Sequence, residues 1–539
     1  MSVLAATITV LSGELAANLL NPEEVNWMYV LENPDSTKVK SASYEKDTDA
    51  EQQKGLKLDA FDPQLFRKHA ELIIAKLENH LADASMRGLS LTNPNILLQK
   101  AKELMTAEGE NIAFPDTEKL EAIVDLYIQT GIQVHSRGYM GRQFSGPIPL
   151  ASAIDLASAV VNQPSSFYEA AQLPNVAERI IADEFNKFIG WEPDRFAMAT
   201  TSGGSLASLT ALLAARNDKF PQSWSEGMSA TAGQARPAIA VGDAHYSICR
   251  AAGIIGIGEQ QIVRLPVNDK KQICPEQIRP ALEAAEKRGL KVFCLVASAG
   301  TTAMGAFDPI DKLGAIAEEK NIWLHIDGAH GGSLIVSDRL RHKLKGVEKA
   351  DSFIIDAHKM MFVPAACTLL FYKNKEKSYG AFRQEASYVF EKEPDVYTAF
   401  DSAEKNFECT KRPLIMNLWV LWALYGRALF AEKIEYLCQL AEQAYHILES
   451  ELDFETIHQP EANILCFRYR PSNWDEQAFP NFQLALRNRL REEGKFFISK
   501  VDIDGQTALR VVFMNHQIDS DCFRLLLHEI RAVGQELLG

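Results

Sequence analysis

Short apolar runs alternate with longer amphipathic stretches through the middle of the chain. The runs are four to six residues long and mostly apolar, as in strands that are buried on both faces. The stretches between them have helical lengths, so the pattern suits βα units and predicts a mostly parallel sheet covered by helices. The predicted strands cover residues 196–199, 238–241, 292–297, 322–326, 352–355 and 367–372.

The pattern before this α/β region is mainly helical. Apolar residues at helical spacing predict helices over residues 62–81 and 117–130. Residues 33–55 are polar and charged, and they predict an exposed segment. We therefore assign residues 1–150 to an N-terminal helical segment.

The C-terminal region mixes helices and strands. Its predicted elements are a long helix from Pro413 to about residue 448, strands over residues 464–468 and 508–513, and a helix from Asp519. This order predicts a large α/β domain over residues 151–425 and a small α+β domain over residues 426–539.

Composition narrows the class of protein. The 539 residues suggest two to four domains, and 47% hydrophobic with 24% charged residues is typical of a globular protein. No window reaches the roughly 18 apolar residues of a membrane span. The first 20 residues lack a basic segment and carry Glu14, which argues against a secretory signal. The net charge of −15 argues against a nucleic-acid partner, although one buried arginine could still bind an acidic substrate.

The eight cysteines are scattered and form no C-x-x-C pair. In a chain of this size they predict free thiols in a reducing compartment. We therefore expect a cytoplasmic protein.

A glycine-rich turn follows the first predicted strand. Thr200–Ser205 reads TTSGGS and opens a helix, where Gly204 and Ser205 could present backbone N–H groups to a phosphate. The alternative is an ordinary strand-to-helix turn capped by Ser205.

The strand over residues 292–297 exits into small and polar residues, among them Gly300 and Thr301. Ligands of α/β sheets bind beyond the carboxyl ends of strands, so this exit could give room to a bound ring. A tight loop is the alternative.

An acid ends the next strand. Asp327 follows a buried apolar run, where a carboxylate is costly unless a positive group such as a protonated pyridine nitrogen meets it. A metal site of His325, Asp327 and His330 is the alternative, but no further His/Glu pair completes it.

A lysine follows the strand over residues 352–355. Lys359 stands beside His358 and is followed by two methionines, so it should be partly desolvated, as a Schiff-base lysine requires. The alternative is a surface lysine.

A phosphate loop, an acid and a lysine at strand ends, and a possible ring-stacking His245 occur in one α/β region. This is the set that pyridoxal 5'-phosphate (PLP) chemistry needs. The chain resembles the group II PLP-dependent decarboxylases over about residues 120–515. The resemblance implies a fold-type I enzyme, similar to aspartate aminotransferase, with a large sheet of seven-stranded type.

The resemblance also implies roles for single residues. Lys359 matches the Schiff-base lysine, Asp327 the partner of the pyridine nitrogen, His245 the imidazole on one ring face and Ala329 the small residue on the other. Gly204 and Ser205 match the phosphate grip, and we count Thr301 and His358 among the cofactor-binding candidates.

Three further candidates concern the substrate. Arg510 resembles the family's carboxylate-binding arginine, although a strand-edge arginine in a surface ion pair is the alternative. Gln143 is a substrate contact in a stretch that departs from the family pattern, where Arg142 could add a positive charge. Tyr397 is the candidate donor of the Cα proton, with Tyr388 as the second choice.

The motifs over residues 299–309 and 358–361 look most like the glutamate-decarboxylase branch, and within it the bacterial aspartate 1-decarboxylases. The predicted reaction is α-decarboxylation of L-aspartate to β-alanine, a pantothenate precursor. L-Glutamate and cysteine sulfinate are alternative substrates, and a PLP lyase or aminotransferase is the alternative class. The resemblance also implies a homodimer embraced by the N-terminal segment.

Overall fold

The computed structural model describes residues 61–105, 117–231, 233, 235–382, 397–472, 474–475 and 481–539. The predicted exposed segment over residues 33–55 lies outside them. The chain divides into two compact units. The smaller unit comprises residues 1–70 and 106–117. The larger unit comprises residues 71–105 and 118–539, and it contains both sheets and the cavity described below.

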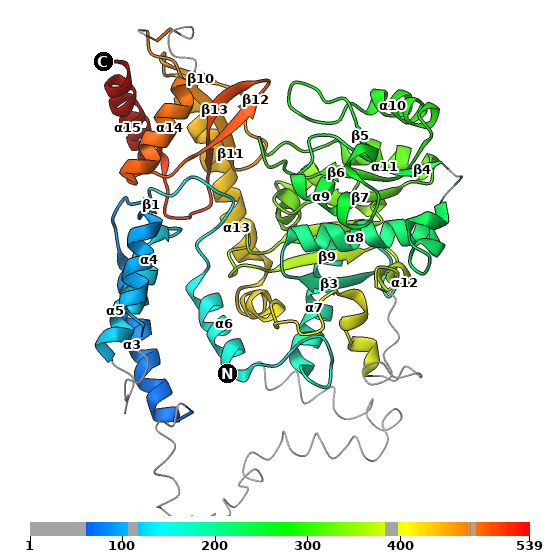
Figure 1. Cartoon of the computed structure of the whole chain (residues 1–539), viewed down its shortest axis with the longest axis horizontal. Coiled ribbons are helices and arrows are strands. Elements are labelled where there is room, and N and C mark those ends of the chain that lie inside the picture. The colour runs from blue at the N-terminus through cyan, green and yellow to red at the C-terminus, as the bar shows by residue number, and fades with distance from the viewer. Residues whose placement is uncertain are drawn as a thin grey trace, which may run out of the picture. The chain divides into compact units, whose positions relative to one another are not determined.

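A seven-stranded sheet forms the centre of the larger unit (Figure 1). Its strands are β3 (Ala197–Thr201), β4 (Arg236–Val241), β5 (Ile262–Arg264), β6 (Leu290–Ser298), β7 (Trp323–Asp327), β8 (Ser352–Asp356) and β9 (Thr368–Tyr372). They lie in the order β3-β9-β8-β7-β6-β4-β5, and β9 alone among them runs antiparallel to its neighbours. The predicted mostly parallel sheet is confirmed.

All six strands predicted for this region are present, with ends shifted by at most two residues. The prediction omitted β5, which has three residues and lies at the edge of the sheet. An edge strand this short carries too little apolar periodicity to stand out from a loop.

Helices cover both faces of this sheet. They are α7 (Gln172–Ile189), α8 (Gly204–Lys219), α9 (Tyr246–Ile254), α10 (Pro275–Lys287), α11 (Ile310–Glu319) and the short α12 (Lys375–Ser378). Helix α6 (Pro149–Val161) instead packs against the long helix over Ile415–Glu449. Successive residues of a strand point to opposite faces. In β6, Cys294 and Val296 therefore pack with α8 and α9, whereas Leu295 and Ala297 belong to the core on the other face.

The parallel register brings three strand ends together. Ser298 at the end of β6 pairs with Asp327 at the end of β7, and Asp327 pairs with Ile354, two residues before Asp356 ends β8. Thr368, the first residue of β9, pairs with Asp356. This edge of the sheet therefore collects the polar residues that follow the buried strands.

The C-terminal region contains a four-stranded antiparallel sheet in the order β10-β11-β13-β12. Its elements are α13 (Ile415–Glu449), β10 (Phe454–Thr456), β11 (Ile464–Tyr469), α14 (Phe482–Glu493), β12 (Ser499–Ile503), β13 (Gln506–Val512) and α15 (Ser520–Leu538). The predicted strands and terminal helix are confirmed, whereas β10 and β12 were not predicted. The predicted long helix is not continuous, because Gly426 within α13 has φ 64° and ψ −170°. The domain boundaries remain predictions.

Helices α3 (Pro63–Ala82) and α5 (Thr117–Gln129) confirm the two helices predicted near the N-terminus. The unpredicted α4 (Pro94–Glu103) and the two-residue strands β1 (Leu89–Ser90) and β2 (Gly131–Ile132) lie between and after them. In the described part of the chain, no helix combines the length and apolar character needed to cross a membrane.

Candidate active site

A cavity of about 600 Å³ lies where the predicted motifs converge, at the carboxyl ends of β6, β7 and β8. Nine of the eleven predicted site residues line it: Gln143, Gly204, Ser205, His245, Thr301, Asp327, Ala329, His358 and Lys359. Arg510 and Tyr397 do not. A larger cavity of about 760 Å³, lined by Lys76, His80 and His135 among others, contains none of the predicted residues.

The glycine-rich turn leaves the start of α8 open. Gly203 is the N-cap with φ 130°, and no side chain caps the helix, so the alternative of a turn capped by Ser205 does not hold. A Cβ on Gly204 would lie 2.9 Å from Asp356 Oδ1 and 3.3 Å from the Ala329 Cβ. A side chain at Gly204 would therefore force Asp356 to move. The N–H groups of Gly204 and Ser205, at the uncapped start of the helix, remain available to an anion such as the PLP phosphate.

Asp327 is buried at the end of β7, and burial raises its pKa. Its Oδ1 accepts a hydrogen bond from the Ala329 N–H at 3.2 Å. Among the described residues, no lysine, arginine or histidine nitrogen lies within 4.0 Å of this carboxylate. A buried acid without a contacting cation fits the protonated ring nitrogen of PLP, which would complete the charge pair.

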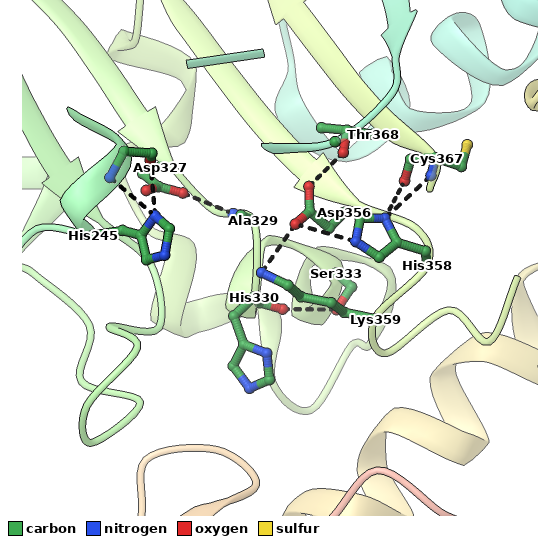
Figure 2. Close-up of polar contacts among 12 residues, drawn as sticks. His245, Asp327, Ala329, His330, Ser333, Asp356, His358, Lys359, Cys367 and Thr368 are labelled. Atoms are coloured by element: carbon green, nitrogen blue, oxygen red, sulfur yellow. Dashed lines mark hydrogen bonds and ion pairs between the residues drawn. The ribbon is translucent and has the colours of Figure 1, made fainter. Parts of the chain in front are cut away.

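Lys359 does have a partner, which the sequence motifs did not predict. Its Nζ lies 2.9 Å from Oδ2 of Asp356, the last residue of β8 (Figure 2). Oδ1 of Asp356 accepts a 2.6 Å hydrogen bond from the Thr368 hydroxyl, and His358 Nε2 lies 3.7 Å from Oδ2. Burial would raise the pKa of Asp356, but Lys359, His358 and Thr368 outweigh burial and hold it below its usual value.

His245 is the N-cap of α9 and presents a neutral ring to the cavity. Its Nδ1 accepts hydrogen bonds from the Ser247 N–H at 3.3 Å and the Ser247 hydroxyl at 2.8 Å (Figure 2). Burial lowers the pKa of His245. A neutral imidazole at this position can lie against a flat ligand, as the family resemblance implies.

His330 is a third histidine of the cavity wall, beside His245 and His358, and the sequence analysis considered it only as a metal ligand. Its Nε2 lies 2.7 Å from Asn463 Oδ1, and the Asn463 amide donates to Phe513 O, which fixes Nε2 as the protonated nitrogen. Burial lowers the pKa of His330 to about 3, and Nδ1 has no hydrogen-bond partner among the described residues. Those residues contain no cluster of three or more His, Cys, Asp or Glu that could hold a metal ion.

Arg510 lies in β13, between β11 and β12, and is 6% exposed, so it is not a strand-edge surface residue. Its guanidinium donates to Ala303 O at 2.9 Å, to Thr302 O at 2.7 Å and to Ser499 Oγ at 3.0 Å. Burial lowers its pKa to about 10. The arginine therefore holds the loop that follows β6.

Tyr397 is 60% exposed and stacks on Tyr168, with 5.8 Å between the ring centroids. Tyr388, the second choice for proton donor, lies outside the described residues. Tyr397 is therefore not among the residues that line the cavity.

Two adjacent residues at the cavity wall have unused donors. The Gln143 Nε2 is buried and has no hydrogen-bond partner among the described residues. Arg142 is exposed, and its guanidinium makes no hydrogen bond or ion pair with the described residues. Both side chains can donate to an acceptor in the cavity.

Solved structures with the same fold include mouse CSAD, with a TM-score of 0.81 and 22% identity over 88% of this chain and 99% of that one. Another is the glutamate decarboxylase domain of diaminobutyrate-pyruvate transaminase and L-2,4-diaminobutyrate decarboxylase from Vibrio parahaemolyticus. Its TM-score is 0.78, with 20% identity over 90% of this chain and 99% of that one. Oryza sativa TDC with PLP and tryptamine has a TM-score of 0.81 and 20% identity over 89% of this chain and 100% of that one. The fold is that of the fold-type I PLP enzymes.

Residues 111–470, well over half of the chain, match the model of the pyridoxal-dependent decarboxylase conserved domain. The chain belongs to this family, and its cofactor is PLP. The resemblance inferred from the motifs is thereby confirmed at the level of the family.

Proposed function

We propose that the protein is a PLP-dependent α-decarboxylase of a small acidic amino acid, with L-aspartate as substrate and β-alanine as product. The observation that carries the proposal is the convergence of Lys359, Asp327 and the uncapped start of α8 on one cavity. Bound PLP supplies an electron sink for the bond between Cα and the carboxylate.

Each cavity residue then has a defined task. Lys359 would hold the cofactor covalently through its amino group. Asp327 keeps the ring nitrogen protonated, because a buried carboxylate with no contacting cation favours a positive partner. His245 and Ala329 bound the two ring faces, and the backbone N–H groups at Gly204 and Ser205 bind the phosphate. Thr301 and His358 complete the cofactor-binding set.

Arg142 and Gln143 support an acidic substrate. The Arg142 charge is uncompensated among the described residues, and the buried Gln143 amide lacks an acceptor. A side-chain carboxylate would supply acceptors to both. Arg510 donates two of its five N–H groups to the loop after β6 and one to Ser499 of β12, so two remain for the substrate α-carboxylate.

The alternative substrates are L-glutamate and cysteine sulfinate. A methylene is worth only about 1–3 kcal/mol of discrimination, so the choice among these acids rests on assays. A PLP lyase or aminotransferase remains the alternative class, and Tyr397 as donor of the Cα proton is the feature that would favour the decarboxylase.

We also propose a cytoplasmic homodimer. All eight cysteines are free thiols, as a reducing compartment requires. Exposed apolar side chains on α6, among them Leu156, Val160 and Val161, offer a surface that a second copy could cover. Sedimentation that finds a fully active monomer would refute the dimer.

The test is a substrate panel on the purified full-length protein with PLP. Carbon dioxide and the amine product are measured with L-aspartate, L-glutamate and L-cysteine sulfinate, and with L-tryptophan as a non-acidic control. We expect kcat/KM to be highest for L-aspartate. Turnover of L-tryptophan alone would contradict an acidic substrate, and a 2-oxo acid formed without carbon dioxide would identify an aminotransferase.

A further inference from the structure

Asp356 occupies an unusual place between the lysine and the phosphate site. Its Oδ2 lies 2.9 Å from Lys359 Nζ, and its Oδ1 lies 2.9 Å from the point where a Gly204 Cβ would be. Gly204 is the first residue of α8, whose N–H groups are proposed to bind the PLP phosphate. One buried carboxylate therefore contacts the lysine on one side and lies close to Gly204, at the start of α8, on the other.

The surroundings of Asp356 keep it charged and fixed. The Thr368 hydroxyl donates to it from β9, and His358 Nε2 stands 3.7 Å away. Asp356 in turn acts as a like charge on Asp327, at the end of the neighbouring strand, and raises its pKa. The side chain of Asp356 is 4% exposed and that of Lys359 is 17% exposed, so water screens the pair only weakly.

We propose that Asp356 is a positioning residue that holds the amino group of Lys359 as an ammonium whenever the lysine is not bound to PLP, and that its charge opposes the PLP phosphate. This inference rests on the proposed role of Lys359.

The chemistry of the covalent link gives the reason. The Lys359 nitrogen bonds to the aldehyde carbon of PLP and one water leaves, but an ammonium has no lone pair and must first lose its proton. A carboxylate at 2.9 Å stabilises the ammonium and so opposes that loss. Once the link has formed, Asp356 loses its cation and faces the phosphate as a like charge.

This arrangement suits turnover. When the substrate amine displaces Lys359, the lysine again needs a partner in a buried site, and Asp356 provides it. The substrate ammonium gives up one proton before it bonds to the aldehyde carbon, and the released lysine takes up one proton. Lys359 is then held as an ammonium and cannot return to the cofactor until it loses that proton. Asp356 thus favours the state in which the substrate, rather than the lysine, is joined to PLP.

The experiment titrates full-length apoprotein with PLP between pH 5 and pH 9. Absorbance reports the lysine-bound cofactor, and fluorescence quenching gives the dissociation constant of PLP. In Asp356→Asn we expect the pH of half-maximal absorbance to fall by about one unit and PLP to bind about fivefold more tightly at pH 7.

Asp351→Asn is the matched control. Asp351 accepts a hydrogen bond from the Leu324 N–H and directly precedes β8, so it stands at the opposite end of the strand from Asp356. Its replacement should leave both measured quantities unchanged. An Asp356→Asn protein that titrates like wild type overturns the inference.

Two more variants separate other outcomes. If Lys359→Ala keeps the absorbance of a lysine-bound cofactor, the proposed function fails, whatever Asp356 does. If Asp356→Asn does not fold by circular dichroism, Thr368→Val tests the same network. Removing the hydroxyl that shares the carboxylate charge should move the half-maximal pH upward by a few tenths of a unit, and no movement there also overturns the inference.

Discussion

Two neighbouring strands of the large sheet both end in an aspartate, but the pKa values of the two carboxyl groups shift in opposite directions. Asp327 ends β7 and Asp356 ends β8, and both are buried. Burial raises the pKa of Asp327. The pKa of Asp356 lies below its usual value, although burial acts on it in the same direction.

The difference comes from the partners. Asp356 meets Lys359 and the Thr368 hydroxyl directly, whereas Asp327 is contacted by the Ala329 N–H and by no cation among the described residues. Asp356, the satisfied acid, already contacts a cation, whereas Asp327, the unsatisfied acid, contacts none among the described residues and can accept one. We read the unsatisfied acid as the site of the cofactor ring and the satisfied acid as the holder of the lysine.

Replacing Lys359 by alanine should have the largest effect, because it removes the cation that distinguishes the two strand ends. We expect the absorbance of lysine-bound PLP and turnover to be lost together. Turnover is measured as carbon dioxide release with the best acidic substrate. A variant that retains about a tenth of wild-type activity would contradict the assignment, since loss of covalent catalysis should cost more.

Asp327→Asn should come next. PLP should still bind, but decarboxylation at saturating PLP should slow by about a hundredfold, because a neutral amide cannot hold the ring nitrogen protonated. Asp356→Asn should differ from Asp327→Asn, because it should shift the pH dependence of PLP binding. That difference would separate the roles of the two aspartates. Equal rates in wild type and Asp327→Asn would mean that the unsatisfied acid does not meet the ring.

The comparison extends to Arg142 at the cavity wall. Arg142→Gln should raise KM for the acidic substrate by about tenfold, because a charge-assisted contact to the side-chain carboxylate is lost. Arg137→Gln is the matched control, since Arg137 belongs to the same stretch but pairs with Asp519 at 2.8 Å. Similar KM values in both variants would remove Arg142 from the substrate site.

Tyr397→Phe should have the smallest effect on carbon dioxide release. If its hydroxyl supplies the Cα proton, protonation should move to the aldehyde carbon of the cofactor. The products should then include an aldehyde, and the enzyme should lose activity during turnover. Aldehyde and bound PLP are followed over time. Normal amine formation with stable PLP would assign the proton to another donor.

The sequence predicted the strand ends well because their signal is local. A buried apolar run that stops at a polar residue can be read directly, and Asp327, Lys359 and Gly204 lie at such a stop or within three residues after it. Nine of the eleven predicted residues therefore line one cavity. The weak predictions depended on alignment across loops, as for Tyr397.

What the sequence by itself determined was the chemistry: the residue types at strand exits and their order specified a PLP enzyme. Only the tertiary structure showed which atoms contact the buried charged groups. Thr368 reaches Asp356 from a strand that runs antiparallel, and Arg510 reaches the Thr302 carbonyl across 208 residues of chain. The physical reason is that a buried group's charge depends on which atoms surround it. Strand order in the sheet, rather than spacing in the chain, brings those atoms together.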